Sequence, residues 1–453
     1  METETRLVDY LIHTNFESIP QGPLRTIKDM ILRDLGTTVA GSSSEGCEEV
    51  INFYRARGGR EEATVFIHGG KMPAPNAAFV NSVMSRSLDF CDAMAPGVHI
   101  GSSVVPTAFA AAELAGGCSG REFLTALILG TELSSRLNLT ESAYDGFDPT
   151  GVCTIFAATA VAGRILGLNH SQMWNALALA FNKSGGSFQS NIDGSLAVRI
   201  IQGWVSQNAI TCAQFARMGI TGPRNFLEGV YGYFHLFGRD RVDPERISEA
   251  LGDHFELQQM VFKKYPSCGL TQGCTEAILS LMKEENVKAG DIREIYIYVP
   301  PYAHKLVGHQ FRLGENPRVN AQFSIQYCVA SALLRGHSQL QNFEETAVRD
   351  PDVMSFLEKI SVTPDPQLDS RGHTALDMRV LTEKGEQYIK KVDIAPGFPG
   401  NPLTQEEHLS HYWECIEAIP QGLSKESAEI IPRLVNRMEE LEDIQTIIPH
   451  LLR

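Results

Sequence analysis

Acidic, basic and hydroxyl side chains gather between residues 89 and 103 of the chain. They belong to Asp89, Asp92, His99, Ser102 and Ser103. Two carboxylates near an imidazole can divide general-acid and general-base roles, because burial and neighbouring charges push their pKa values apart. A structural interpretation is also open, in which Asp89 caps or pairs locally and His99 is a hydrogen-bonded core histidine. These residues alone leave both interpretations standing.

The segment that carries these side chains is expected to be a loop between two buried helices. Apolar and alanine residues at 77–88 and 104–114 predict the helices. Pro96-Gly97 interrupts helical structure between them. Catalytic residues are frequent on loops held by rigid elements. We expect Ser102 and Ser103 either to donate hydrogen bonds to a substrate carboxylate or to cap the second helix.

Composition and charge exclude several classes of protein. Of 453 residues, 43% are apolar and 21% are charged, which is ordinary for a globular chain long enough for two or three domains. The formal net charge of −15 disfavours nucleic acid and anionic membranes as partners. The acidic start of the chain shows no secretory signal, and no apolar run approaches the roughly 20 residues that cross a bilayer.

Cysteine and histidine spacing predicts neither disulfides nor a metal site. Nine scattered cysteines lack CxxC or zinc-type spacing, so we expect free thiols and a cytoplasmic location. His408 and His411 stand one turn apart on an expected surface helix. Without a third ligand they are not expected to bind a metal ion.

Most of the chain is predicted to be helical. Helical spacing of apolar residues predicts a core helix over 24–40, and small residues allow close packing among the helices that follow. These helices are expected at 121–137, 150–166, 171–184 and 196–218. Asn169 and Ser171 are both possible N-cap residues for the third of them. The pattern favours a compact all-α domain.

The pattern changes after residue 263. Residues 292–300 alternate as in a strand, and 373–381 and 387–394 form a predicted hairpin around Glu383-Lys-Gly-Glu386. Helices are expected at 324–334 and 352–359, and again at 404–418 and 424–442 beyond a Pro/Gly linker. We therefore predict two domains built from three segments of the chain. Residues 1–263 and 401–453 form a helical domain, and residues 264–400 form an α/β domain.

Several motifs in order resemble the MmgE/PrpD family, which includes 2-methylcitrate dehydratase, cis-aconitate decarboxylase and iminodisuccinate epimerase. The motifs are Ser87-Leu-Asp-Phe-Cys-Asp92 with His99, Ser102-Ser-Val-Val-Pro-Thr107, Gly146-Phe-Asp-Pro-Thr150, Gly203-Trp-Val-Ser-Gln-Asn208, Gly219-Ile-Thr-Gly-Pro223 and Lys263-Lys-Tyr-Pro-Ser-Cys268. The resemblance covers nearly the whole chain. It implies a large helical domain from both chain ends, an inserted α/β lid domain, and a homodimer.

The same resemblance implies which residues form the site. Those in catalytic positions are Asp89, Asp92, His99 and Lys263. Those in substrate-binding positions are Ser102, Ser103, Asp148, Arg199, Tyr265, Cys268 and Gln272. Lys263 would hold a substrate carboxylate or stabilise enediolate charge. We do not expect Cys268 to be a nucleophile, because no base is paired with it in the sequence.

Four positions depart from the family pattern. Asp148 and Gln272 replace histidines found in relatives, Val198 replaces a lysine, and Ala93 replaces a threonine. These changes remove cationic and proton-transferring groups from the expected site. We therefore expect a substrate with fewer carboxylates than aconitate or methylcitrate, or one carrying a hydroxyl or amine that Asp148 can bind.

The function expected from the resemblance is that of a cofactor-independent lyase, a dehydratase or decarboxylase, acting on a small carboxylic acid. The enzyme would transfer a proton next to a carboxylate and expel water or carbon dioxide. Two other functions stay open. One is an isomerase or epimerase on the same scaffold, and the other is a non-catalytic protein that binds carboxylates.

Overall fold

The computed structural model describes residues 2–139, 146–419 and 421–453. Helices dominate these residues, which confirms the predicted mainly α fold. The chain divides into two compact units. The first consists of Met1–Met260 and His408–Arg453, and the second of Val261–Glu407. In the described part of the chain, no helix is both long enough and apolar enough to cross a membrane.

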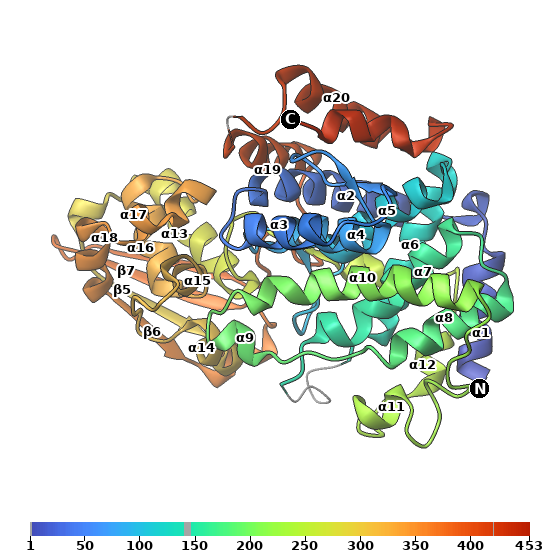
Figure 1. Ribbon diagram of the computed structural model, residues 1–453. Coiled ribbons are helices and arrows are strands. Elements are labelled where there is room, and N and C mark those ends of the chain that lie inside the picture. The colour runs from blue at the N-terminus through green and yellow to red at the C-terminus, as the bar shows by residue number, and fades with distance from the viewer. Residues whose placement is uncertain (1, 140–145, 420) are drawn as a thin grey trace. The chain divides into compact units, whose positions relative to one another are not determined.

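The centre of the first unit is a group of packed helices (Figure 1). They are α2 (Gln21–Gly41), α4 (Ala74–Arg86), α5 (Gly101–Ala115), α6 (Gly120–Leu137), α7 (Ile155–Ile165), α8 (His170–Phe181) and α10 (Ala197–Arg217). Helix α10 packs against α4, α5, α7 and α8, and α4 packs against α2 and α5. Gly203 permits the approach of α10 to α4, because a Cβ there would lie 2.9 Å from the Phe79 ring.

Shorter elements complete the first unit. The helices are α1 (Glu2–His13), α3 (Cys47–Arg57), α9 (Gln189–Ile192), α11 (Tyr233–Leu236), α12 (Pro244–Ser248), α20 (Lys425–Asn436) and, from His408 onward, α19 (Gln405–Glu417). Strands β1 (Ala63–Thr64) and β2 (Lys71–Met72) form a small antiparallel pair. The predicted helix at 424–442 is wrong in its last six residues, since α20 ends at Asn436. Asn169 is the N-cap residue of α8, in a reciprocal arrangement with Gln172.

The second unit contains a four-stranded sheet in the order β6-β5-β7-β8. Its strands are β5 (Ile292–Val299), β6 (Ile360–Pro364), β7 (Leu376–Thr382) and β8 (Gln387–Val392). β5 is parallel to β6 and antiparallel to β7, which pairs antiparallel with β8. The predicted strand at 292–300 and the predicted hairpin are confirmed, with Ile295, Ile297 and Val299 buried.

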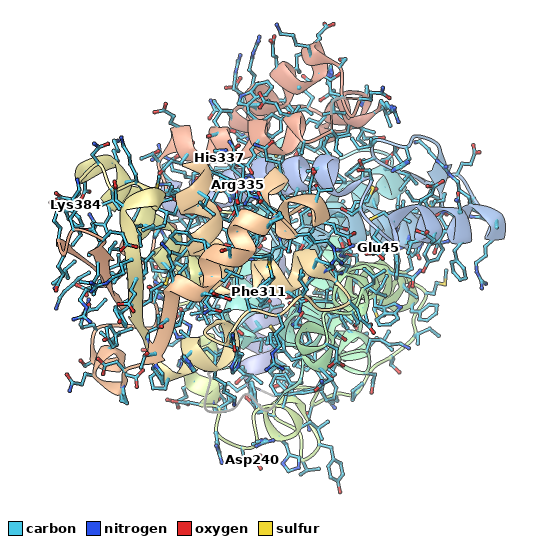
Figure 2. All side chains as sticks on the ribbon, turned by 90° about the vertical axis from the view of Figure 1, so that its left-hand side faces the viewer. Glu45, Asp240, Phe311, Arg335, His337 and Lys384 are labelled. Carbon is cyan, nitrogen blue, oxygen red and sulfur yellow. The ribbon has the colours of Figure 1, made fainter. Side chains whose placement is uncertain are left out.

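Six helices also lie within the described residues of the second unit. They are α13 (Gln272–Glu284), α14 (Pro301–Val307), α15 (Pro317–Gln322), α16 (Ile325–Arg335), α17 (Glu345–Val348) and α18 (Pro351–Phe356). α13 contacts β7, β8 and α16, which in turn contacts β6. Arg335, labelled in Figure 2, donates to the Ala347 carbonyl (2.9 Å) and to Asp350 (3.2 Å). It thereby ties the last turn of α16 to α17 and the start of α18.

Candidate active site

The loop between α4 and α5 carries the first group of predicted site residues. It leaves α4 at Arg86, includes the short strand β3 (Asp92–Ala93), and enters α5 at Gly101. Met94 and Val98 exchange two backbone hydrogen bonds of 2.9 Å around the Pro96-Gly97 turn. The predicted loop between two buried helices is therefore confirmed.

Asp89 is held by an arginine, Arg86, that lies outside the predicted site residues. The Arg86 guanidinium donates to Asp89 Oδ1 at 2.6 Å, and both side chains are buried. Burial alone lowers the pKa of Arg86, but the charges of Asp89, Cys91 and Asp148 together raise it above its ordinary value. The guanidinium therefore stays positive beneath the loop. The only sequence signal for Arg86 is its place three residues before Asp89, at the end of a helix.

His99 is fixed in one tautomer. Its Nδ1 lies 2.6 Å from the carbonyl oxygen of Asp92, and its backbone N–H donates to Thr150 Oγ1 at 3.0 Å. Because a carbonyl oxygen only accepts hydrogen bonds, Nδ1 carries the proton. In the neutral ring, Nε2 is then the basic nitrogen. A half-buried imidazole oriented in this way is suited to general-base chemistry.

Asp92 binds the first turn of α5. Its Oδ2 accepts from the Ile100 N–H and its Oδ1 from the Gly101 N–H, both at 3.0 Å. A carboxylate at a helix N-terminus is stabilised by the unpaired N–H groups and the helix dipole. The structure therefore places this buried carboxylate on backbone groups of the loop and helix.

Asp148 comes close to this loop through Thr150, at the start of a π-helical turn (Thr150–Thr154) that precedes α7. The Thr150 N–H donates to Asp148 Oδ1 at 2.9 Å, while Thr150 Oγ1 accepts from His99. Burial raises the pKa of Asp148, and the hydrogen bonds from Thr150 and the charge of Arg86 offset part of this rise. Asp148 is thus a carboxyl group biased toward its protonated form.

The two serines lie inside α5 and do not cap it. Ile100 is the N-cap residue and makes no side-chain capping bond, so the capping alternative is wrong. Both serines are fully buried. Ser103 Oγ donates to the side-chain oxygen of Gln202 on α10, and Ser102 Oγ has no hydrogen-bond partner among the described residues. The hydroxyl of Ser103 thus joins two helices in this structure.

Arg199 is directed toward the turn between α2 and α3. Its buried guanidinium donates from Nη1 to the Glu45 carbonyl at 2.8 Å. The preceding residue, Val198, is half-buried. The hydrogen bond to Glu45 stabilises the turn, and substrate binding by Arg199 remains a prediction.

The second unit holds the other predicted site residues. The Gln272 side chain accepts from the Tyr265 N–H (2.9 Å) and donates to the Tyr265 carbonyl (3.0 Å). The Tyr265 hydroxyl donates to Glu276 at 2.5 Å, and burial together with the Glu276 charge raises its pKa. Lys263 is buried, and Cys268 is half-buried with its N–H on the Gln322 carbonyl. Gln272 therefore fixes the backbone of this motif in place of a histidine.

The two histidines of α19 are buried, so the predicted surface location is wrong. His408 and His411 are 3% and 4% exposed. His408 Nε2 lies 3.7 Å from Asp29 Oδ2, and His411 Nε2 donates to the Phe90 carbonyl at 2.9 Å. Burial holds the pKa of His411 well below its usual range. Among the described residues, no group of three or more His, Cys, Asp or Glu side chains is arranged to hold a metal ion.

Family models match both parts of this arrangement. The MmgE/PrpD N-terminal domain matches residues 5–245, and the MmgE/PrpD C-terminal domain matches residues 265–436. The chain belongs to the MmgE/PrpD family. It is 26% identical to human cis-aconitate decarboxylase, over 93% of this chain and 88% of that protein. It is 23% identical to 2-methylcitrate dehydratase of Escherichia coli, over 96% of this chain and 88% of that protein.

These MmgE/PrpD relatives are decarboxylases and dehydratases, so the chain is an enzyme of the lyase type. In the first unit, hydrogen bonds connect three of the predicted residues, Asp92, His99 and Asp148. Asp89 is paired with Arg86, whose charge also acts on Asp148. Arg86, the partner of Asp89, and Thr150, which links His99 to Asp148, were missed as site residues. Threonine in the Gly146–Thr150 motif was a visible signal for the second of these.

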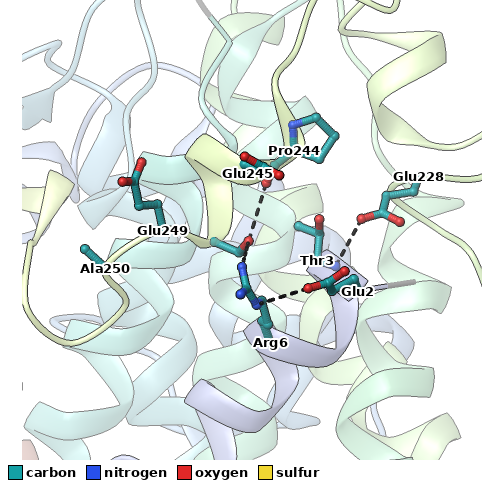
Figure 3. A pocket seen from close by; sticks show the side chains of 9 residues that line it. Glu2, Thr3, Arg6, Glu228, Pro244, Glu245, Glu249 and Ala250 are labelled. Atoms are coloured by element: carbon teal, nitrogen blue, oxygen red, sulfur yellow. Dashed lines mark hydrogen bonds and ion pairs between the residues drawn. The ribbon is translucent and has the colours of Figure 1, made fainter.

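A surface hollow elsewhere in the first unit does not suit an anionic substrate of an MmgE/PrpD enzyme. It has a volume of about 460 Å³ and lies beside α1 and α12 (Figure 3). The carboxylates of Glu2, Glu228, Glu245 and Glu249 surround it, with Arg6 as its lining cation. Arg6 already lies 3.7 Å from Glu2. The excess of negative charge repels a carboxylate ligand.

Proposed function

We propose that this protein is a cofactor-independent lyase that acts on a small carboxylic acid by proton transfer next to a carboxylate. The observation that carries the proposal is the 2.6 Å contact of His99 Nδ1 with the Asp92 carbonyl, which places the proton on Nδ1 and makes Nε2 the basic nitrogen. Nε2 would remove a proton from the carbon beside a substrate carboxylate. The electron pair would then move into the carboxylate as an enediolate forms.

A second proton transfer would complete an elimination. The carboxyl group of Asp148 is biased toward its neutral form by burial. It would give its proton to a leaving hydroxyl as the carbon–oxygen bond breaks, which produces water. In a decarboxylation, the same proton would go to the carbanion that forms when the carbon–carbon bond breaks and carbon dioxide leaves.

Positive charge is needed to stabilise the enediolate. In the first unit, Arg86 supplies a buried guanidinium beside Asp89. Lys263 would supply an ammonium group, a role proposed from the family pattern alone. A Lys263→Gln variant with unchanged kcat and KM would remove this residue from the proposal.

The test of the proposal is a thermal-shift screen against mono-, di- and tricarboxylic acids, followed by NMR analysis of each acid that binds. Product formation that survives EDTA and dialysis supports a cofactor-independent lyase. Deuterium from solvent, or an epimer, without an elimination product would instead establish the isomerase. Binding without turnover or exchange would establish a non-catalytic carboxylate-binding protein.

The substrate is expected to carry fewer carboxylates than aconitate or methylcitrate. Asp148 adds a carboxyl group where relatives have a histidine, and Val198 removes a cation. Leaving a buried substrate charge unpaired costs several kcal/mol as a rough figure. The paired change Asp148→His with Val198→Lys is therefore expected to raise kcat/KM for tricarboxylates about ten-fold or more, equivalent to roughly 1.4 kcal/mol.

Steady-state assays with cis-aconitate and methylcitrate measure this change. The matched control is Asp193→His with Val198→Lys, because Asp193 is an exposed aspartate. Efficient turnover of either tricarboxylate by the unmodified protein would contradict the expectation.

We also propose that the enzyme is a homodimer and that the outer face of α10 takes part in the contact. Trp204, Phe215 and Met218 are 50%, 47% and 77% exposed. At about 100° per residue, the second and third lie within roughly 40° of the first around the helix. An exposed apolar stripe of this kind marks an interaction surface.

Light scattering coupled to gel filtration tests the dimer. Trp204→Glu with Phe215→Glu is expected to convert the dimer to a monomer, because charges would be buried without partners. Ile389→Glu, at another exposed apolar residue, is the matched control and should leave the dimer intact. A monomeric unmodified protein would refute the proposal.

A cytoplasmic location is also proposed. All nine cysteines are free thiols in the structure. Free thiols are typical of reducing compartments, whereas disulfides accumulate in oxidising ones. Fractionation of the source cells would test this location.

A further inference from the structure

A second carboxylate, from Asp34 on α2, reaches the N-terminus of α5 beside Asp92. Asp34 is buried, and its Oδ1 accepts from Ser85 Oγ of α4 at 3.4 Å. Its Oδ2 has no hydrogen-bond partner among the described residues. A buried, ionised carboxylate oxygen without a hydrogen bond destabilises the folded state. When it is protonated, the same oxygen can donate a hydrogen bond.

The two carboxylates meet at Gly101. A Cβ at this position would lie 1.9 Å from Asp34 Oδ2 and 2.3 Å from Asp92 Oδ1. The two oxygens are therefore no further apart than the sum of these distances. Position 101 has to be glycine because the carboxylates occupy the volume of a side chain.

The charges around this pair favour one shared proton. Two buried carboxylates so close together do not both ionise readily. Burial and the charge of Asp92 raise the pKa of Asp34 well above its ordinary value, although Arg33 and Ser85 lower it in part. Burial lowers the pKa of Arg33 only to about 10, so it stays charged at neutral pH. A pair with one proton carries one negative charge, which Arg33 balances.

Asp92 connects this pair to the proposed base. Its carboxylate binds the N–H groups of Ile100 and Gly101, and its carbonyl accepts from Nδ1 of His99. Three consecutive residues are thus held by one aspartate. Rotation of the Asp92 side chain would release the N–H groups of Ile100 and Gly101, the two residues that follow His99.

We propose that Asp34 is a positioning residue whose protonated carboxyl group donates a hydrogen bond to Asp92 and thereby holds His99 in its working orientation. This proposal rests on the proposed function for its kinetic consequences. Asp92 is then also a positioning residue, because its carboxylate acts through the backbone of residues 100 and 101. His99 is the group that touches the substrate.

Asparagine and alanine at position 34 separate this role from general packing. Asp34→Asn keeps an N–H donor of similar shape facing Asp92, so kcat is expected to stay within about two-fold of the unmodified enzyme. Asp34→Ala removes the donor and is expected to lower kcat about ten-fold or more with little change in KM, since small displacements of a reacting group are costly. Equal losses of kcat in both variants would overturn the proposal.

Melting temperature against pH gives a readout that needs no substrate. A raised pKa in the folded state means that stability falls as pH rises from the ordinary value of 3.8 toward the folded pKa. Asp34→Asn removes this dependence. The variant is expected to melt on the order of 2 °C or more above the unmodified protein at neutral pH, with the difference vanishing near pH 4.

The matched control is Asp29→Asn on the same helix. Asp29 also acts on Arg33 but faces His408, with 3.7 Å between Oδ2 and Nε2. Loss of this carboxylate is expected to lower the melting temperature at neutral pH. If Asp34→Asn lowers it in the same way, Asp34 is an ionised partner of Arg33 and the proposal fails.

The tautomer of His99 provides the final measurement. ¹⁵N NMR of histidine-labelled protein is expected to show the Nδ1–H form in the unmodified protein and in Asp34→Asn, but a mixture in Asp34→Ala. An unchanged His99 signal in Asp34→Ala would refute the link to the base. If no carboxylic acid is turned over, the proposed function fails, while the melting and NMR results still decide the role of Asp34.

Discussion

Replacing His99 with glutamine is expected to lower kcat by about 10²–10⁴-fold while leaving the fold intact. The glutamine amide can still donate to the Asp92 carbonyl, which now accepts from Nδ1 of the imidazole at 2.6 Å. It cannot accept a proton as Nε2 does. Steady-state kinetics, with circular dichroism and melting curves on the same samples, measure the two effects separately.

The matched control for this substitution is His68→Gln. His68 is exposed, and its Nε2 also lies 2.9 Å from a backbone carbonyl, that of Ser42. Its replacement should leave kcat unchanged. A His99→Gln enzyme that melts early but keeps its specific activity would show that His99 is only structural.

A catalytic role of Asp89 is better tested with asparagine than with alanine. Asp89→Ala is expected to abolish turnover, but it also removes the partner of a buried guanidinium at 2.6 Å. Breaking a buried ion pair in this way costs about 3–5 kcal/mol, which would confuse stability with catalysis. Asp89→Asn keeps the shape and a hydrogen-bond acceptor for Arg86. Loss of kcat in the asparagine variant without a loss of stability would support a direct role.

Replacing Asp148 with asparagine is expected to lower kcat about 10²-fold and to remove the alkaline limb of its pH profile. Burial raises the pKa of this carboxyl group, so it keeps its proton to higher pH than an ordinary aspartate. As pH rises through the folded-state pKa, the proton is lost and the acid can no longer protonate the leaving group. The unmodified enzyme should therefore lose kcat on the alkaline side.

Profiles of kcat from pH 5 to 9 on both proteins measure this effect. Asp193→Asn, at an exposed aspartate, is the control and should retain the full profile. If the Asp148→Asn variant still loses kcat at alkaline pH, the titration of a different group causes that loss. Stability offers a second check, because Asp148→Asn removes a carboxyl group that destabilises the fold as pH rises above 3.8.

Local patterns in the sequence were enough to predict most helices and strands of this protein. The alternation of Ile295, Ile297 and Val299 predicted β5, because side chains on a strand point to opposite faces in turn. Pro96-Gly97 predicted the loop, because proline lacks the backbone donor that a helix needs. The order of the motifs predicted the MmgE/PrpD family, and the family models confirm it. All of these signals act over a few residues or through their order along the chain.

Only the tertiary structure decided which polar groups meet. Nothing near position 34 in the sequence points to position 92, and nothing near His411 points to Phe90. Their contacts depend on which faces of α2, α5 and α19 pack together, and this is set by burial over the whole core. The same packing placed His411, expected on the surface, in the core as a buried neutral donor. The residue types in the sequence therefore indicated which reactions are chemically possible. The packing of helices that are distant in the sequence decided which of these groups carry protons.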